Sequence, residues 1–328
     1  MAPDKIFRHG LIVGKFAPFH KGHQYLIDRA LKDCGQLTVL VYANPDFGAM
    51  PQAVRAAWIK ALYPDITVLQ PLDPPVDTAD DFTHRDYVRH YLLDKRIEID
   101  AVFTSEDYGD GFANHLGVTH RSVDRQRLAV PASGTQIRAD VHAHHHLLDP
   151  AVYRHFIQKI VLMGAESTGK STLAKHLAET FQTVHVPEYG RELWEQKKGQ
   201  LELADYVQIA QEHQRREDEA LKAARRFLFI DTNAITTLAL SYYYNGGALP
   251  ELHAIARNCI SRYHRWLVCA DDIPFEQDGW RDTEILRTKM QRMILYDLTE
   301  RGIRFDYVEG SLAQRIATVR RLLDGPLA

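Results

Sequence analysis

The chain has 328 residues, a length that favours two domains, each large enough to bury its own core. Hydrophobic residues make up 45% of the chain and charged residues 25%, a balance that excludes intrinsic disorder. The formal net charge of −3 provides no bulk positive field, so we expect neither a nucleic acid nor an anionic membrane as a partner.

Cysteine usage and hydropathy indicate where the protein works. The three cysteines, Cys34, Cys259 and Cys269, lie far apart and lack CxxC spacing, which favours neither disulfides nor a zinc ribbon. Apolar runs fall short of the roughly 18 residues that span a membrane, and the N-terminus lacks the apolar core of a signal peptide. We therefore expect a cytoplasmic protein without membrane insertion.

Short apolar runs alternate with longer amphipathic stretches, the pattern of a parallel sheet covered by helices, and the pattern starts twice. The first series predicts strands at 10–14, 37–43, 66–69 and 101–104, and helices over 23–34, 53–62 and 81–95. The second series predicts strands at 159–163, 226–231 and 266–270, a helix over 169–181 and a final strand–helix pair over 304–323. The fold class is therefore α/β with two domains.

The segment 140–150, DVHAHHHLLDP, is polar, rich in histidine and ended by proline, so it predicts a linker. We expect residues 1–150, including the linker from about 140, to form the first domain and residues 151–328 the second. The linker histidines are expected to face solvent rather than to bind a metal.

A turn follows the first predicted strand and leads into the first helix: Gly14-Lys15-Phe16-Ala17-Pro18-Phe19-His20-Lys21-Gly22-His23. Ligands of open α/β sheets bind at this end of the strands, where a helix N-terminus also accommodates phosphate. His20 and His23 can donate hydrogen bonds to a polyphosphate. A second segment, Ser133-Gly134-Thr135-Gln136-Ile137-Arg138, predicts a helix start that Ser133 and Thr135 can cap, with Arg138 directed toward bound phosphates.

Together these two segments resemble the nucleotidyltransferase superfamily, whose motifs are an HxGH turn and an SxTxxR helix start. With SEDYG at 105–109 they look most like nicotinamide mononucleotide adenylyltransferases. The resemblance implies a doubly wound, Rossmann-like domain in which the phosphate of nicotinamide mononucleotide attacks the α-phosphorus of ATP, giving NAD and pyrophosphate. It assigns ATP phosphates to His20 and His23, charge compensation to Lys15 and Arg138, the triphosphate to Ser133 and Thr135, and further ATP contacts to Gly14, Phe16 and Gly22. Arg55 and Trp58, on the helix predicted over 53–62, are candidates for substrate contact, but a surface arginine and a buried tryptophan are expected instead.

The segment 164–171, GAESTGKS, matches the P-loop pattern GxxxxGK[ST] between a predicted strand and a predicted helix. In such a loop Lys170 reaches the β and γ oxygens of the nucleotide and Ser171 ligates Mg²⁺. The other ATP contacts expected from the loop are Gly164, Ser167, Thr168, Gly169 and Thr172. Asp231 ends a strand where P-loop proteins place the carboxylate on the metal side. Since no NKxD element follows, we expect a small-molecule kinase rather than a GTP switch.

Four segments, AESTGKST, EYGRE, FIDTN and DGWR, look like the ribosylnicotinamide kinase domain of bifunctional NadR-type proteins, and the two halves of the chain follow that family's order. The resemblance implies transfer of the γ-phosphate of ATP to the 5′-hydroxyl of nicotinamide riboside. It assigns the riboside to Glu188 and Arg191, a phosphate clamp to Arg281, and further riboside or lid contacts to Asn233 and Asp278. Two alternatives stay open: Glu188 or Asp231 is the general base, and Tyr189 and Trp280 either stack on the nicotinamide ring or pack in the core.

We therefore expect an enzyme that makes NAD from nicotinamide riboside in two ATP-dependent steps with Mg²⁺ as cofactor. A homo-oligomer and a functional link to a riboside transporter fit this expectation. The first strand begins within about ten residues, which leaves no room for a DNA-binding helix-turn-helix, so transcriptional repression is not predicted. The alternatives are another nucleoside kinase fused to a different nucleotidyltransferase, or a nucleotide sensor with one inactive site.

Overall fold

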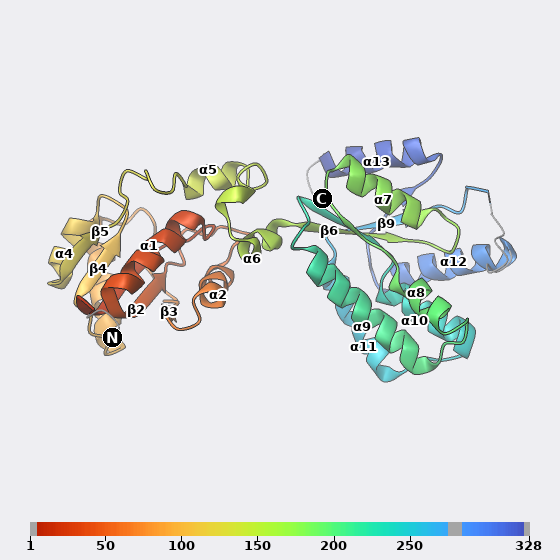
Figure 1. Ribbon diagram of the computed structural model, residues 1–328, viewed down its shortest axis with the longest axis horizontal. Coiled ribbons are helices and arrows are strands. Elements are labelled where there is room, and N and C mark those ends of the chain that lie inside the picture. The colour runs from red at the N-terminus through yellow and green to blue at the C-terminus, as the bar shows by residue number, and fades with distance from the viewer. Residues whose placement is uncertain (1–4, 275–283, 325–328) are drawn as a thin grey trace. The chain divides into compact units, whose positions relative to one another are not determined.

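The computed structural model describes residues 5–274 and 284–324. Its contacts divide the chain into two compact units, Met1–Phe156 and Ile157–Ala328. Each unit is built on one five-stranded sheet flanked by helices (Figure 1). The predicted α/β fold class with two parallel sheets is confirmed.

The first unit has the strand order β3-β2-β1-β4-β5, with every pair of neighbours parallel. Its strands are β1 Phe7–Gly14, β2 Cys34–Val41, β3 Thr67–Leu69, β4 Ala101–Thr104 and β5 Thr119–Ser122. Its helices are α1 Lys21–Asp33, α2 Gln52–Leu62, α3 Asp81–Asp94, α4 Gly109–Leu116, α5 Gly134–Ala139 and α6 Pro150–Tyr153, with short 3₁₀ turns at His145–Leu147 and Arg154–Phe156. The strand order reverses between β1 and β4, which is where open α/β sheets bind their ligands.

Apolar residues of the central strands make the core of the first unit. Leu11, Leu40 and Val102 are fully buried and pack against Val88 of α3 and Phe112 of α4. The runs predicted as buried strands therefore lie at the centre of the sheet. β5, with the sequence THRS, was not predicted because an exposed edge strand carries no apolar run.

The segment predicted as a linker is folded onto the first unit. Leu148 is 3% exposed and pairs with His20 in an antiparallel bridge. His142 Nδ1 lies 3.0 Å from the hydroxyl of Tyr153, and His144 Nε2 lies 3.1 Å from Gln136 Nε2. These contacts attach the segment to the histidine turn, to α5 and to α6.

The second unit has the strand order β10-β9-β6-β8-β7, again with parallel neighbours. Its strands are β6 Gln158–Met163, β7 His185–Val186, β8 Phe227–Asp231, β9 Arg265–Cys269 and β10 Asp306–Val308. Its helices are α7 Lys170–Thr180, α8 Tyr189–Gln196, α9 Leu203–Ala220, α10 Ala234–Asn245, α11 Pro250–Asn258, α12 Glu284–Glu300 and α13 Leu312–Asp324, with a 3₁₀ turn at Cys259–Arg262. Ile160, Phe229 and Leu267 of the sheet pack against Leu173 and Leu177 of α7.

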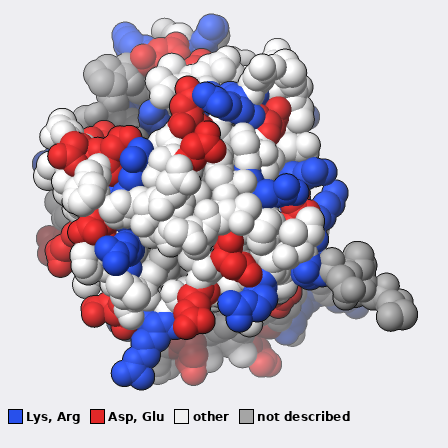
Figure 2. Space-filling model, turned by 90° about the vertical axis from the view of Figure 1, so that its left-hand side faces the viewer, with Lys and Arg blue, Asp and Glu red and all other residues white. Residues whose placement is uncertain are grey.

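Surface charge and the length and hydropathy of the helices bear on whether a nucleic acid or a membrane is a partner. On the face drawn in Figure 2, Lys and Arg side chains are interspersed with Asp and Glu side chains. Across the described ranges, the structure contains no helix with the length and apolar character needed to cross a membrane.

Candidate active sites

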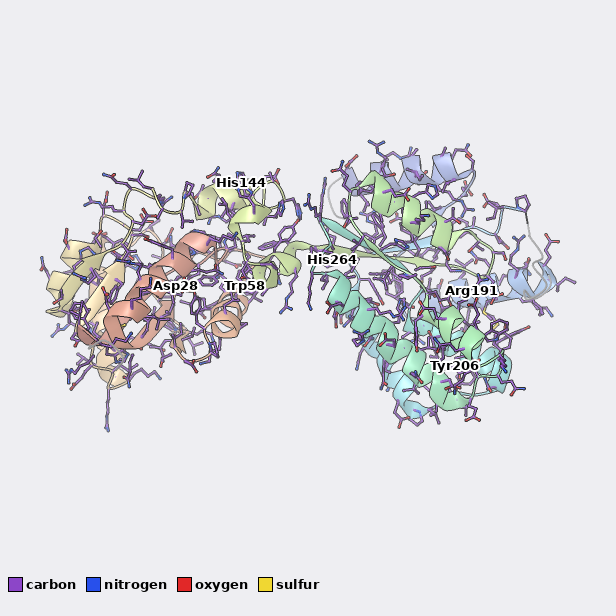
Figure 3. All side chains as sticks on the ribbon, in the orientation of Figure 1. Asp28, Trp58, His144, Arg191, Tyr206 and His264 are labelled. Carbon is purple, nitrogen blue, oxygen red and sulfur yellow. The ribbon has the colours of Figure 1, made fainter. Side chains whose placement is uncertain are left out.

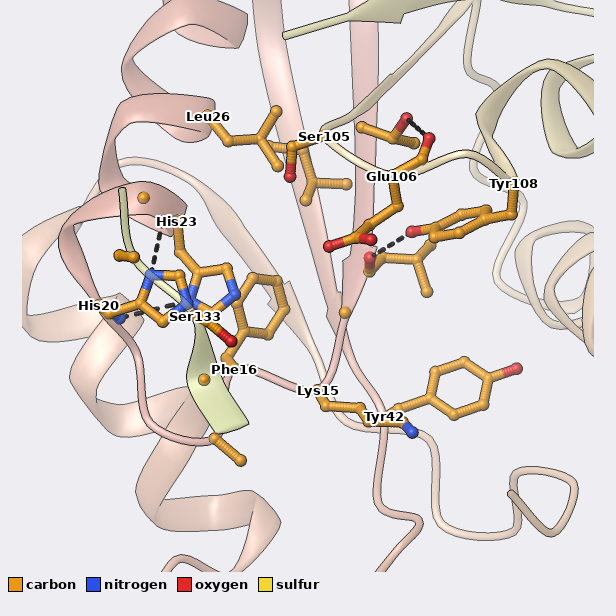
Figure 4. A pocket seen from close by; sticks show the side chains of 18 of the residues that line it. Lys15, Phe16, His20, His23, Leu26, Tyr42, Ser105, Glu106, Tyr108 and Ser133 are labelled. Atoms are coloured by element: carbon orange, nitrogen blue, oxygen red, sulfur yellow. Dashed lines mark hydrogen bonds between the residues drawn. The ribbon is translucent and has the colours of Figure 1, made fainter. Parts of the chain in front are cut away.

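A cavity of about 660 Å³ lies in the first unit, at the carboxyl ends of β1 and β4 (Figure 4). It is lined by all the residues that the sequence predicted for adenylyl transfer: Gly14, Lys15, Phe16, His20, Gly22, His23, Ser133, Thr135 and Arg138. Two segments more than a hundred residues apart, the turn after β1 and the start of α5, therefore contribute to one site.

His20 and His23 form a reciprocal cap at the start of α1. His20 Nδ1 accepts from the backbone N–H of His23 at 3.4 Å, and His23 Nδ1 accepts from the backbone N–H of His20 at 3.3 Å. The two rings stack with centroids 3.6 Å apart (Figure 4). Since both Nδ1 atoms accept, the ring protons reside on Nε2, and each histidine is an N–H donor.

The electrostatic surroundings keep both rings neutral. Burial, reinforced by the charges of Arg127 and Arg138, lowers the pKa of His20 to about 4. Burial also holds the pKa of His23 well below its ordinary value, with His20 and Arg127 adding to the effect. Near neutral pH the pair supplies hydrogen bonds without carrying charge.

Positive charge at the cavity comes from lysine and arginine. Lys15 forms an ion pair with Asp77, another lining residue. Arg138 donates to the carbonyl of Ala17 at 2.5 Å and to the hydroxyl of Thr135 at 3.0 Å. Arg127, which the sequence analysis missed, lines the cavity and pairs with Glu106 at 2.9 Å. The cavity is therefore suited to polyphosphate.

Ser133 occupies the N-cap position of α5, but its side chain makes no capping hydrogen bond, contrary to the expected cap. Ser133 lines the cavity instead. Thr135 accepts from Arg138.

Arg55 is buried, and the expectation of a surface arginine was wrong. Its side chain is 1% exposed and donates to the carbonyls of Lys15, Tyr42, Ala43 and Met50. The guanidinium thus ties together the loops that follow β1 and β2. Trp58, labelled in Figure 3, is buried as predicted, at 7% exposure. Its ring lies against those of His155 and Phe156.

The predicted P-loop connects β6 to α7 in the second unit. Gly164, Ser167 and Gly169 have φ angles of 140°, 58° and 79°, in the left-handed region that lets the chain wrap tightly. Gly164 also permits close approach, because a Cβ there would lie 2.9 Å from the carbonyl oxygen of Cys269. Lys170 Nζ donates to the carbonyl of Ala165 at 2.7 Å.

Two buried side chains that the sequence analysis missed hold this loop. Gln291 accepts from the backbone N–H of Ala165 at 2.8 Å and donates to the carbonyl of Cys269 at 2.9 Å. Arg315 donates to the carbonyls of Thr168 and Ala270, at 2.6 and 3.1 Å, and pairs with Asp272. Both come from helices distant in sequence, so no local pattern could have revealed them.

The end of β8 carries polar atoms without partners. Ser171 donates to Asp231 Oδ2 at 2.5 Å. In the described part of the chain, Asp231 Oδ1, Thr232 Oγ1, Asn233 Nδ2 and Ser167 Oγ are buried and make no hydrogen bond. Asn233 Oδ1 caps α10 by accepting from the N–H of Ile235. Buried polar atoms cost free energy unless a ligand pairs with them, which marks this edge of the sheet as a binding site.

Glu188 precedes α8 and faces the same site. Burial, together with the negative charges of Asp231 and Glu166, raises the pKa of Glu188 to about 7, against the opposing effect of Lys170. The structure therefore brings Glu188, Asp231 and Lys170 together. A carboxyl group with a pKa near neutrality is suited to proton transfer.

The remaining candidates in the second unit are placed differently. Tyr189 is 8% exposed, and the guanidinium of Arg216 lies 4.5 Å from its ring centroid, so one face of the ring is covered. Arg191 is exposed and pairs with Glu195 of the same helix at 3.1 Å (Figure 3). Thr172 lies exposed in the first turn of α7. Asp278, Trp280 and Arg281 lie outside the described residues.

Mg²⁺ requires oxygen ligands, and the second site offers them. The hydroxyl of Ser171 and the carboxylate of Asp231 are adjacent, and Oδ1 of Asp231 has no partner within the described ranges. Residues 5–274 and 284–324 contain no group of three or more His, Cys, Asp or Glu side chains placed for a metal. A hydroxyl and one carboxylate suit Mg²⁺ that takes its other ligands from phosphates and water.

Comparison with known proteins bears on both halves. A family model for the AAA domain matches residues 159–315, and one for the citrate lyase ligase C-terminal domain matches residues 9–133. The trifunctional NAD biosynthesis/regulator protein NadR of Escherichia coli strain K12 is 28% identical over 323 residues, covering 92% of this chain and 78% of the relative. The chain is a homologue of the NadR proteins. The NadR of Salmonella typhimurium matches over the same shares, also at 28% identity.

Solved NadR structures have the same fold. A NadR protein in complex with NR superimposes with a TM-score of 0.73 at 20% identity, covering 99% of both chains. A NadR protein in complex with NAD and AMP-PNP gives 0.72 at 21% identity, again covering 99% of both chains. The predicted resemblance to NadR-type proteins is confirmed.

Proposed function

We propose that this protein makes NAD from nicotinamide riboside in two ATP-dependent steps. The second domain, predicted over residues 151–328, phosphorylates the riboside. The first, predicted over residues 1–150, adenylylates the mononucleotide and releases pyrophosphate. The observation that carries this proposal is that each sheet of a NadR homologue has its predicted catalytic residues gathered at the carboxyl edge.

In the adenylyl transfer, a phosphate oxygen of the mononucleotide attacks the α-phosphorus of ATP, and the bond to the β-phosphate breaks. The attacking phosphate is ionised, so no protein base is needed. This agrees with the low pKa of His20, which cannot exchange a proton near neutral pH. His20 and His23 donate hydrogen bonds to the phosphates, while Lys15 and Arg138 offset the charge on the pyrophosphate. Ser133 and Thr135 bind the triphosphate, beside Gly14, Phe16 and Gly22.

Lys15 must exchange its partner during this reaction. Its ammonium pairs with Asp77 in the structure, and both side chains are about half exposed, so the pair is weak and easily broken. A triphosphate in the cavity offers Lys15 a more highly charged partner.

In the phosphoryl transfer, the 5′-hydroxyl of the riboside loses its proton as its oxygen attacks the γ-phosphorus of ATP, the bond from that phosphorus to the β–γ bridging oxygen breaks, and ADP leaves. We assign the base to Glu188 because its pKa of about 7 suits proton uptake, whereas Asp231 already accepts from Ser171. Lys170 and the loop residues Gly164, Ser167, Thr168, Gly169 and Thr172 bind the nucleotide. Ser171 and Asp231 would hold Mg²⁺, which neutralises the β- and γ-phosphate oxygens when bound.

The riboside is bound beside Glu188. Asn233 supports this assignment, since its buried Nδ2 has no partner in the described residues and can donate to a sugar hydroxyl. Arg191 would reach the riboside only by leaving Glu195, and Tyr189 has one ring face free of Arg216. The lid roles of Asp278, Trp280 and Arg281 stay predictions of the sequence.

We place the protein in the cytoplasm, where the three free and buried thiols of Cys34, Cys259 and Cys269 suit a reducing environment. Its proposed partners are ATP, nicotinamide riboside, nicotinamide mononucleotide and NAD. A homo-oligomer and a link to a riboside transporter stay predictions.

The test is mass spectrometry of the products formed from nicotinamide riboside, ATP and Mg²⁺. We expect NAD from the wild type, mononucleotide alone from His23→Ala, and no product from Lys170→Ala unless mononucleotide is supplied. If the wild type leaves the riboside untouched, the acceptor is wrong. If supplied mononucleotide is not converted to NAD, the adenylyltransferase assignment is wrong.

A further inference from the structure

A histidine that no motif contains lies behind the wall of the adenylyltransferase cavity. His120 of β5 has Nε2 2.9 Å from the hydroxyl of Thr104 at the end of β4, and Nδ1 2.6 Å from Oδ1 of Asp110 in α4. The imidazole is largely buried, with 13% of its side chain exposed, whereas Asp110 is 78% exposed. This chain of hydrogen bonds ends at the cavity, because Thr104 is one of its lining residues.

The residue beside the imidazole leaves space for this contact. Gly109 is buried at the start of α4, and a Cβ at this position would lie 2.1 Å from His120 Nε2 and 2.4 Å from Thr104 Oγ1. Only glycine allows the imidazole and the hydroxyl to meet here. The close approach of three elements, β4, α4 and β5, is therefore built into the sequence.

Thr104 transmits this constraint to the segment that follows it, residues 105–108. Its hydroxyl lies 3.3 Å from the carbonyl of Glu106 as well as 2.9 Å from Nε2 of His120, so this hydroxyl connects the imidazole to the segment. The far end of the segment is held by Tyr108, whose hydroxyl donates to the carbonyl of Val13 at 3.1 Å. Ser105, Glu106 and Tyr108 line the cavity on the side opposite His20, His23 and Ser133 (Figure 4).

The position of this wall indicates which substrate it contacts. Thr104, Ser105, Glu106 and Tyr108 line the same cavity as Val123, Arg127, Ser133 and Arg138. In the proposed function Ser133 binds the triphosphate of ATP and Arg138 offsets the charge on the pyrophosphate, and we assign the nucleoside of ATP to the side of the cavity formed by β4 and β5. The other side of the cavity, lined by Tyr42, is left for the acceptor.

We propose that His120, oriented by Asp110, is a positioning residue that sets the 104–108 wall and thereby the selectivity of the adenylyltransferase for the base of the nucleoside triphosphate. The inference rests on the proposed adenylyl transfer. Most of the effect comes from His120, because an exposed carboxylate such as Asp110 adds little to a pair.

The test compares adenylyl transfer from ATP and from GTP to supplied mononucleotide. His120→Ala is expected to raise the KM for ATP about tenfold and to lower the ATP-to-GTP ratio of kcat/KM, with the KM for mononucleotide unchanged. His120→Gln, which keeps an N–H donor, is expected to recover most of the loss. Gly109→Ala is expected to reproduce the effect of His120→Ala by displacing the ring.

His9→Ala is the matched control. His9 Nε2 lies 2.8 Å from the hydroxyl of Thr38, so this variant also removes a His–Thr contact from the same sheet, but neither residue lines the cavity. Its base selectivity is expected to equal that of the wild type. Riboside phosphorylation by the second unit normalises the amount of protein in every sample, and urea unfolding of the first unit checks that this unit is folded.

The inference is overturned if His120→Ala and Gly109→Ala change only the melting temperature, as His9→Ala would, and keep the wild-type KM and base ratio. Should the wild type fail to transfer adenylyl groups at all, the proposed function fails instead. The inference is then tested by equilibrium dialysis, which measures the affinities for ATP and GTP. The two proteins compared are Lys170→Ala and the double variant Lys170→Ala with His120→Ala. Equal ATP-to-GTP affinity ratios in the two proteins would overturn it.

Discussion

His20 and His23 illustrate how burial determines what a residue can do. Imidazoles with an ordinary pKa would exchange protons near neutrality, but both rings are kept neutral and donate through Nε2. Their contribution to adenylyl transfer is therefore electrostatic, through hydrogen bonds that strengthen as charge moves onto the departing pyrophosphate.

We expect His23→Ala to lower kcat for adenylyl transfer by roughly 10²–10³, the usual effect of removing one donor to a developing charge. The rate is measured with supplied mononucleotide and ATP. His90→Ala, at an exposed position of α3, serves as the control and is expected to behave as the wild type. A loss below about threefold in His23→Ala would contradict a donor role.

The raised pKa of Glu188 predicts how the rate of the kinase depends on pH. A base must be ionised to accept a proton, and the pKa of Glu188 is about 7, so kcat/KM for the riboside should rise with pH and level off above about 7. Glu188→Gln should lower kcat by roughly 10²–10⁴. It should also remove the fall in rate at acid pH, the acidic limb of the profile, apart from the part caused by protonation of ATP. The measurement is a pH profile of riboside phosphorylation between pH 5 and 9.

Two variants test whether Glu188, rather than another carboxylate, is the general base. Glu195→Gln, on the exposed surface of α8, is expected to keep the wild-type profile. Asp231→Asn is expected to raise the Mg²⁺ concentration needed for half-maximal rate, since Asp231 would hold the ion. If Asp231→Asn removes the limb while Glu188→Gln retains it, the base is Asp231.

At the scale of elements, buried arginines hold the loops that carry the sites. Arg55 donates to four carbonyls in the loops after β1 and β2, and only that of Met50 is close to it in the sequence. We expect Arg55→Met to lower the free energy of unfolding of the first unit by about 3 kcal/mol, because those carbonyls lose buried donors. Urea unfolding measures the loss, and Arg29→Met, at an exposed position of α1, should change it little.

Arg315 performs a similar role under the P-loop. Its side chain is 2% exposed and joins Thr168 of the loop to Ala270 after β9 and to Asp272. We expect Arg315→Met to lower the free energy of unfolding of the second unit by about 2–3 kcal/mol and to raise the kinase KM for ATP. Arg320→Met, exposed on the same helix, is the control. An unchanged KM in Arg315→Met would show that the loop holds its shape without this contact.

The elements also explain what the sequence could predict. His20, His23, Lys170 and Asp231 belong to local patterns in which a buried strand, a turn and a helix start follow one another, so their gathering at the carboxyl edges was predictable. Arg55, Gln291, Arg315 and His120 act through contacts made only after the chain folds, and their spacing carries no signal. Ser133 shows a further limit, because a helix start predicts a capping residue but not the direction of its hydroxyl.

For the whole molecule, the central fact is that each unit has its own sheet, core and site. In the proposed function the product of the second unit is the substrate of the first, and the cavity of the first unit is lined by residues of that unit. Mononucleotide released by one molecule should therefore be usable by another.

We accordingly expect NAD production from nicotinamide riboside to be restored when His23→Ala and Lys170→Ala proteins are mixed, although neither forms NAD alone. The measurement is the time course of mononucleotide and NAD after mixing, with a lag that shortens as the Lys170→Ala concentration rises. Conversion of supplied mononucleotide to NAD by Lys170→Ala protein alone provides the reference rate for the second step. If the mixture accumulates mononucleotide while Lys170→Ala converts supplied mononucleotide normally, the intermediate is retained by the molecule that made it, and transfer between the units within one chain becomes the better account.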